Sequence, residues 1–144
     1  MVVAAAAISG QFVGGDWYHG MHQPAWNPSA WFMGISWGVM YALMAVSAWI
    51  VWENRRGPVT VALGWWLFQL LLGVGWSYVF FGLHRIGWSM GVMALWVISA
   101  LVVVYAFRFV KTQASALMLP VIAWLVFSWV LNFVQWHLNG GRSG

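Results

Sequence analysis

Four long runs of apolar residues, separated by short polar segments, make up most of the sequence. They cover residues 31–52, 59–81, 87–107 and 114–136, and no Asp, Glu, Lys or Arg lies inside them. A helix needs about 20 apolar residues to cross the ~30 Å hydrocarbon layer of a bilayer. Because an open strand would leave backbone groups unpaired in lipid, each run predicts a membrane-spanning α-helix.

The segment before these runs is apolar but shorter. Residues 1–13 hold too few apolar residues for an ordinary span, and no basic stretch precedes them, which disfavours a signal peptide. We predict that 1–13 form a first transmembrane helix, short or truncated, and that the loop 14–30, rich in aromatics and turn formers, forms an ordered lid. The expected fold class is therefore all-α integral membrane, a five-transmembrane-helix bundle that forms a single domain over 1–144.

Composition supports a membrane protein and excludes other classes. Hydrophobic residues make up 63% of the 144 residues and charged residues 6%, whereas a soluble domain carries about 25% charged residues. A water-soluble enzyme, a disordered chain and a nucleic-acid-binding protein are therefore excluded.

The few basic residues indicate an orientation. With five helices, the side of the membrane that holds the N-terminus carries four basic residues and the other side two: Arg55, Arg56, Arg108 and Lys111 against Arg85 and Arg142. By the positive-inside rule we expect a cytoplasmic N-terminus, with the lid and the C-terminus on the opposite side of a bacterial membrane.

Ionisable and metal-ligating residues are scarce. None lies at membrane depth, so coupled transport is less favoured than binding, although a transporter stays possible. His84 and His137 lie at predicted helix ends, away from the mid-helix positions of haem ligands. Asp16, His19 and His22 could share a metal ion in principle, but their spacing matches no strong zinc pattern, and we predict no metal site.

Tryptophan is the most unusual feature, with 14 residues. Tryptophans at helix ends fit an interfacial belt. Trp37, Trp76 and Trp124 lie deeper, and each shares a helical face with other aromatic, polar or small residues: Tyr41 with Trp37; Gln69, Gly73, Ser77 and Phe80 with Trp76; Pro120, Phe127, Ser128 and Leu131 with Trp124. Such a face either packs in a crowded core or lines a cavity for a flat apolar ligand, and periodicity leaves both interpretations open.

Glycines spaced four residues apart form a second pattern. Gly34 and Gly38 share one helix face, and so do Gly87 and Gly91. Small residues at this spacing let helices approach closely, within one chain or between two. The pattern favours a homodimer.

Several short segments, in order along the chain, resemble motifs of the translocator protein family, the tryptophan-rich sensory proteins once called peripheral benzodiazepine receptors. The resemblance covers residues 16–140. The matching segments are Trp17-Tyr18, Pro24-x-Trp26-Asn27-Pro28, Trp37-xxx-Tyr41, Val51-Trp52-Glu53, Gln69-Leu70 with Trp76 and Phe80-Phe81-Gly82, and Leu119-Pro120 with Trp124, Phe127, Leu131-Asn132 and Trp136.

The resemblance implies a five-helix bundle, often dimeric, whose pocket is capped by the first loop. Family members bind porphyrins, and some bind sterols or synthetic benzodiazepine and isoquinoline ligands. Carried over by position, the ligand-binding residues would be Tyr18, Trp26, Asn27, Pro28, Trp37, Tyr41, Gly73, Trp76, Ser77, Phe80, Trp124, Ser128 and Leu131. If the light-driven porphyrin breakdown proposed for the family occurs here, Trp37 and Trp124 would be its catalytic residues.

The chain departs from the family motifs at several positions. Gln23 replaces a loop Lys, Ser29 replaces a loop Pro, and Gly73 replaces an Asn of the third helix. Phe133 and His137 stand where a sterol motif needs a Tyr and a base, which argues against sterol binding there.

The function expected from these observations is that of a membrane receptor or binding protein for porphyrins or similar flat apolar ligands, with a role in tetrapyrrole metabolism or transport. No cofactor is required. Two alternatives stay open: a light-dependent porphyrin-degrading activity, and a structural or regulatory subunit of a larger membrane complex.

Overall fold

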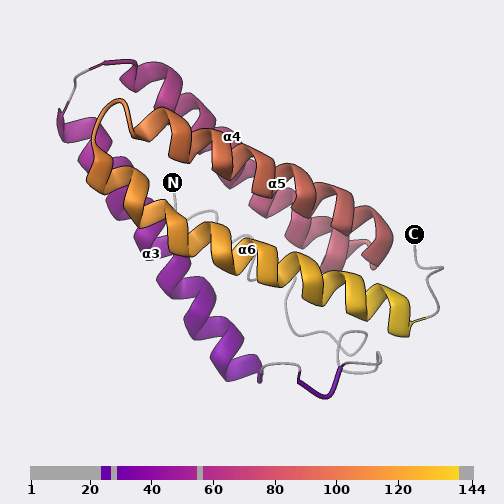
Figure 1. Ribbon diagram of the computed structural model, residues 1–144. Helices are drawn as coiled ribbons and strands as arrows, with labels where there is room; N and C mark the ends of the chain where they lie inside the picture. Colours follow the sequence, from indigo (N-terminus) through magenta and orange to yellow (C-terminus); the bar gives the residue numbers. More distant parts are fainter. Residues whose placement is uncertain (1–23, 27–28, 55–56, 140–144) are drawn as a thin grey trace.

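The computed structural model describes residues 24–26, 29–54 and 57–139, and folds them into long helices without a strand in these ranges (Figure 1). In chain order these are α3 (Ala30–Asn54), α4 (Val59–Ser77), the π-helix η1 (Tyr78–Gly82), α5 (Ile86–Phe107) and α6 (Thr112–Leu138). The four apolar runs are thus confirmed as helices, with ends within a few residues of the prediction. The predicted helix 1–13 and most of the lid 14–30 lie outside the described residues, so the structure supports four spans and not a count of five.

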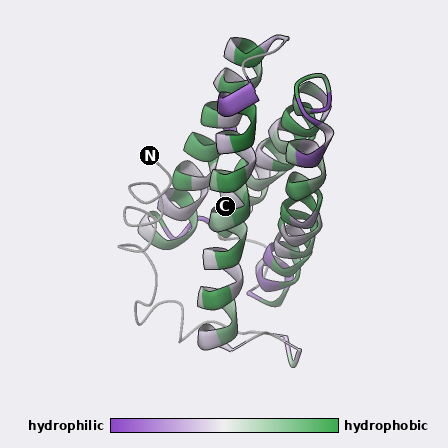
Figure 2. Cartoon of the chain, turned by 90° about the vertical axis from the view of Figure 1, so that its left-hand side faces the viewer, coloured by the Kyte–Doolittle hydropathy of each residue, from purple (hydrophilic) through white to green (hydrophobic). Residues whose placement is uncertain are grey.

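All four long helices can cross a bilayer by length and composition. The candidate spans are Trp31–Asn54, Val59–Gly82, Ile86–Phe107 and Thr112–Leu138. Figure 2 shows hydrophobic residues along the helices, with hydrophilic residues mostly toward their ends. Large apolar side chains such as Trp31, Trp49 and Trp88 are exposed on this surface. Such a surface suits lipid and not water, and the chain is a multi-pass integral membrane protein.

The helices pack in an order that leaves α3 at one edge. Helix α5 packs against both α4 and α6, while α3 packs mainly against α6. Near the C-terminal end of α3, the hydroxyl of Ser47 donates to the carbonyl oxygen of Ala114 at 2.7 Å. In Figure 1 the two helices diverge from this crossing toward the N-terminal end of α3. The bundle is therefore wider at the end where α3 begins and α6 finishes.

The turns at the opposite, narrow end lie close together. Gly57, which follows α3, has a φ of 70°, a left-handed conformation that favours glycine. A Cβ on Gly57 would lie 3.2 Å from the carbonyl oxygen of Phe109, in the connection between α5 and α6. The sequence predicts these two turns on the same side of the membrane, and the structure confirms that they share one end of the bundle.

A π-helical turn, which the sequence does not predict, ends α4 at the wide end. The backbone N–H of Leu83 donates to the carbonyl oxygen of Tyr78 at 2.9 Å, five residues earlier. Such turns are rare and are frequent at functional sites. The segment carries Phe80 and Phe81, whose rings meet at 4.7 Å between centroids. His84 then reverses the chain with a φ of 57° before α5 begins.

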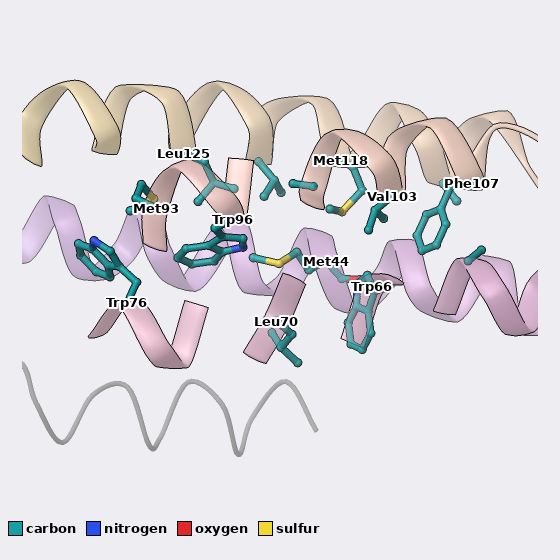
Figure 3. Close-up of a cluster of buried hydrophobic side chains, with 14 of the residues drawn as sticks. Met44, Trp66, Leu70, Trp76, Met93, Trp96, Val103, Phe107, Met118 and Leu125 are labelled. Carbon is teal, nitrogen blue, oxygen red and sulfur yellow. The ribbon is translucent and has the colours of Figure 1, made fainter. Parts of the chain in front are cut away.

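The interior is built from tryptophan, methionine and aliphatic side chains. Figure 3 shows Trp76, Trp96, Met44 and Trp66 in a row along the bundle, with Leu125 and Met118 on the α6 side. Nearly all of these side chains are fully buried. Since lipid provides no hydrophobic driving force between helices, close packing and buried hydrogen bonds hold this core together.

Candidate functional site

A narrow cavity lies at the wide end of the bundle, where α3 begins, α4 passes into η1 and α6 finishes. Three helical segments line it: Met33 and Trp37 from α3; Trp76, Phe80 and Phe81 from α4 and η1; Ser128, Leu131, Asn132 and Gln135 from α6. Its volume is about 30 Å³. That is room for a water molecule, whereas sites for drug-sized ligands span about 300–1,000 Å³. The structure therefore shows a closed state of the cavity.

Trp37 is the centre of an aromatic cluster beside this cavity. Its ring stacks on Trp76 at 5.9 Å and on Trp96 at 5.5 Å between centroids, with interplanar angles of 27° and 19°. Trp124 meets Trp37 edge-on at 5.9 Å, and Tyr41 lies 6.2 Å away. Four aromatic side chains from four helices thus surround Trp37. In this closed state the indoles stack on one another beside the cavity.

Three polar atoms beside the cavity are buried and have no hydrogen-bond partner among the described residues. They are the indole Nε1 of Trp76, the indole Nε1 of Trp124 and the hydroxyl of Ser128. An unpaired buried donor costs about 1–3 kcal/mol, so protein interiors rarely keep several together. Two indole N–H groups and one hydroxyl could satisfy the acceptor atoms of a ligand such as carbonyl or carboxylate oxygens.

Trp96 forms the inner boundary of this cluster and was missed by the sequence analysis. Its Nε1 donates to Oε1 of Gln69 at 2.8 Å, and Nε2 of Gln69 contacts the sulfur of Met44 at 3.5 Å. The six-membered edge of the indole lies against Gly73, where an added Cβ would come within 2.7 Å of the ring. The glycine that departs from the family motif is thus required by this tryptophan. Gly73 is predicted to contact a ligand, but in the closed structure the Trp96 ring covers it.

A polar cluster ties α5 to α6 next to the cavity. The hydroxyl of Ser89 lies 2.6 Å from the carbonyl oxygen of Ile86 and 3.1 Å from Oδ1 of Asn132. The amide of Asn132 donates to the same carbonyl at 3.2 Å. All three residues are buried. Asn132 therefore has a structural partner, although it also lines the cavity.

Of the residues predicted to bind a ligand, five line the cavity: Trp37, Trp76, Phe80, Ser128 and Leu131. Trp124 and Tyr41 border it through Trp37. The predicted face on α4 is buried along its length, Ser77 included. On α6, Ser128 and Leu131 of the predicted face are buried, while Pro120 is exposed.

Sequence reasoning also missed several lining residues. Met33 and Phe81 look like ordinary apolar positions, and Gln135 and Asn132 lie close to the end of the last span. The spacing of Ser128, Asn132 and Gln135 places them on one helix face, and it could have indicated that they line the same site.

Little of the predicted lid can be placed. Tyr18, Asn27 and Pro28 lie outside the described residues. Pro24 is buried, and Trp26 is half exposed with its ring 6.0 Å from Phe127 of α6. The part of the lid that is described therefore contacts α6 near the cavity.

Other chemistry is sparse in the described part of the chain. No group of three or more His, Asp or Glu side chains comes together there to hold a metal ion, while Asp16, His19 and His22 lie outside it. Two larger hollows lie elsewhere: one at the connection between α3 and α4, lined by Trp52, Gly57, Pro58, Val59, Thr60 and Val61, and one on α4, lined by Val61, Gly64, Trp65 and Phe68. The residues that line these two hollows lack buried unpaired polar atoms of the kind that surround Trp37.

Taken together, four lipid-facing helices and a tryptophan-lined cavity define a polytopic helical membrane protein with an internal aromatic site. Sequence comparison gives the particular family: the TspO/MBR family model matches residues 1–137, and the chain belongs to this family.

Its relatives include eukaryotic, bacterial and archaeal proteins. The human protein named translocator protein is 33% identical over 143 residues, covering 95% of this chain and 85% of its own length. The protein CrtK of Rhodobacter capsulatus is 30% identical, covering 96% and 88%. The tryptophan-rich protein TspO of Archaeoglobus fulgidus is 31% identical, covering 96% and 93%.

Proposed function

We propose that this protein is a membrane receptor for porphyrins or similar flat tetrapyrroles, held between the indoles of Trp37, Trp76 and Trp124. The observation that carries the proposal is the set of three buried donors beside the Trp37 cluster that find no partner within the described part of the chain. A porphyrin has a wide π-face for stacking and carboxylate side chains as acceptors, which is the chemistry that these groups lack in the closed state.

Binding requires the cavity to open. The ligand must separate indoles that now stack at 5.5–5.9 Å between centroids. The least constrained wall is α3, which packs mainly against α6 and is fixed by the Ser47 hydrogen bond at its far end. Movement of the N-terminal half of α3, which carries Met33 and Trp37, would enlarge the cavity without breaking the α4–α5–α6 packing.

The test is a titration of the detergent-solubilised protein with protoporphyrin IX in the dark, followed by tryptophan fluorescence. The wild type and the Trp37→Phe/Trp124→Phe variant are compared. Saturable quenching that weakens in the folded variant supports the proposal. Linear quenching in both, as from unspecific partition into the micelle, contradicts it.

A second candidate is light-dependent breakdown of the bound porphyrin beside the same pair, with dissolved O2 as the oxidant: the light-excited ring is oxidised and O2 is reduced. The observation in its favour is the edge-on contact of Trp37 and Trp124, with Trp76 and Trp96 stacked on Trp37 as further redox-active indoles. Loss of porphyrin absorbance in the light, absent in the dark and in Trp124→Phe, supports catalysis. Equal bleaching on an unrelated carrier protein contradicts it.

Assembly and orientation complete the proposal. Gly34 and Gly38 are exposed on α3, and nothing lies within 4 Å of the position that a Cβ would take on either, so a second copy of the chain could approach there as a homodimer. A role as a subunit of a larger membrane complex would use the same face.

Arg108 and Lys111 lie at the narrow end, beside the turn that follows α3. Their positive charge supports a cytoplasmic location for that end, in a bacterial membrane by our prediction.

A further inference from the structure

Trp96 of α5 does not line the cavity itself but lies next to it, on the side toward the middle of the bundle (Figure 3). It is 1% exposed, and its ring is stacked on Trp37, which lines the cavity. In Figure 3 it lies between Trp76 and Met44 in the row of side chains along the bundle. A ligand that enters from the wide end therefore meets Trp96 as soon as it passes Trp37 and Trp76.

Three independent contacts hold Trp96 in this position. Its Nε1 donates to Gln69 at 2.8 Å, one face stacks on Trp37 at 5.5 Å between centroids, and its edge sits against the bare backbone of Gly73. Side chains fixed by a buried hydrogen bond and by close packing do not yield easily to a ligand. The opening of α3 would move Trp37 away, but it would leave Trp96 on α5 in place.

We infer that Trp96 is a specificity-determining residue that sets the inner depth of the ligand site. The inference rests on the proposed function and deepens it. In the wild type, a flat ligand can extend only from the entrance to Trp96. Of two flat ligands, the site therefore binds the longer one less tightly. Gly73 helps to set the same depth, because a side chain there would collide with the Trp96 indole and displace it.

The test compares two flat probes of different length, protoporphyrin IX and a synthetic dipyrrin of half its size. In Trp96→Ala, protoporphyrin IX should bind at least about tenfold more tightly than in the wild type, as expected for newly available pocket contacts, while the dipyrrin changes little. Adding 3-methylindole, which has the shape of the deleted side chain, should refill the space and return the tetrapyrrole affinity toward the wild-type value.

Trp66→Ala is the matched control. Trp66 is also a buried indole, with Nε1 bonded to the carbonyl oxygen of Met44 at 3.2 Å, but it lies farther from the cavity than Trp96, on the other side of Met44 (Figure 3). This variant removes the same side chain elsewhere in the core and should not gain tetrapyrrole affinity. If Trp96→Ala does not fold, Trp96→Leu retains an apolar side chain and serves the same comparison.

The outcomes separate the two proposals. A wild type that binds both probes, with no tetrapyrrole gain in Trp96→Ala or an equal gain in Trp66→Ala, overturns the role of Trp96 and leaves the proposed function standing. Saturable tetrapyrrole binding that is seen only in Trp96→Ala supports the role of Trp96 and contradicts porphyrin binding by the wild type. Absence of binding in all variants overturns both.

Discussion

At the scale of single residues, the fit between indoles defines the wide end of the bundle. Trp37 contacts aromatic side chains from α3, α4, α5 and α6, and two of its neighbours have an indole N–H without a partner among the described residues. Because the described helices are apolar on most sides, these few directional groups distinguish the wide end of the bundle from the rest of the core.

Gly73→Ala tests the contact between α4 and Trp96. The new methyl group would lie 2.7 Å from the indole, so the ring or the helix must shift. We expect a loss of about 1–3 kcal/mol in the free energy of unfolding, typical of overpacking. Thermal unfolding in detergent, followed by near-UV circular dichroism, measures it.

Gly75→Ala is the control, because nothing lies within 4 Å of its Cβ position on the same helix. Alanine is the better helix former, so this variant should be as stable as the wild type or more so. Equal destabilisation by the two substitutions would show that helix geometry, and not Trp96, determines the effect.

Some residues of this cluster could be predicted from the sequence and others could not. Gln69, Gly73, Trp76 and Phe80 recur at helical spacing, so a common buried face could be predicted and was found. Trp96 stands between Leu95 and Val97 in the next span, and Ser99 is the only polar residue within one helical turn of it. Its importance comes from contacts with α3 and α4, which periodicity within one helix cannot reveal.

At the scale of elements, the wide end is held by the junction of η1, α5 and α6. Helix α5 starts directly after the π-turn, and the Ser89–Asn132 cluster fixes its first turn to α6. This arrangement keeps Phe80 and Phe81 of η1 against the cavity.

Asn132→Leu tests this junction. Leucine has the same branching and the same number of side-chain heavy atoms but cannot donate to the carbonyl of Ile86, and it leaves the Ser89 hydroxyl with one partner fewer. We expect a loss of about 0.5–2 kcal/mol, the range for hydrogen bonds between membrane helices. Asn139→Ala, which removes a bond to Gln135 within the last turn of α6, should cost less. The reverse order would contradict the assignment.

Helix ends and the π-turn show where prediction from sequence reached its limit. The spans 31–52 and 114–136 lie inside the observed Ala30–Asn54 and Thr112–Leu138, because helices continue into the polar boundary where hydropathy already falls. The run 59–81 predicts one regular helix. Its last residues belong instead to the π-turn Tyr78–Gly82, which hydrophobicity does not distinguish from an α-turn.

At the scale of the whole molecule, the two ends of the bundle differ in shape and charge. The narrow end joins Gly57 to Phe109 and carries Arg108 and Lys111, whereas the wide end holds the cavity. The chain has no cysteine, so single cysteines can report on each end.

We expect Lys111→Cys to react with a membrane-impermeant maleimide only from the cytoplasmic side, and Leu83→Cys only from the opposite side. Both positions are exposed. Labelling of right-side-out and inverted vesicles measures it. Reaction of both cysteines from one side would contradict a membrane-spanning α5, and an exchange of sides would reverse the proposed orientation.

The proposed homodimer makes a separate prediction. Gly34→Leu/Gly38→Leu should lower the dimer fraction, because leucine prevents close approach of two α3 helices. Light scattering in detergent gives the mass. Gly64→Leu, on the exposed face of α4, is the control. An unchanged dimer would place the interface elsewhere, and a wild type that is monomeric would contradict the proposal.

The central claim is that the Trp37 cluster binds a flat tetrapyrrole, and the most direct measurement is the dark titration with protoporphyrin IX. We predict saturable quenching of tryptophan fluorescence in the wild type. The quenching should weaken in the Trp37→Phe/Trp124→Phe variant, even though phenylalanine keeps an aromatic ring at both positions. Quenching that does not saturate, or that saturates equally in both proteins, would contradict it.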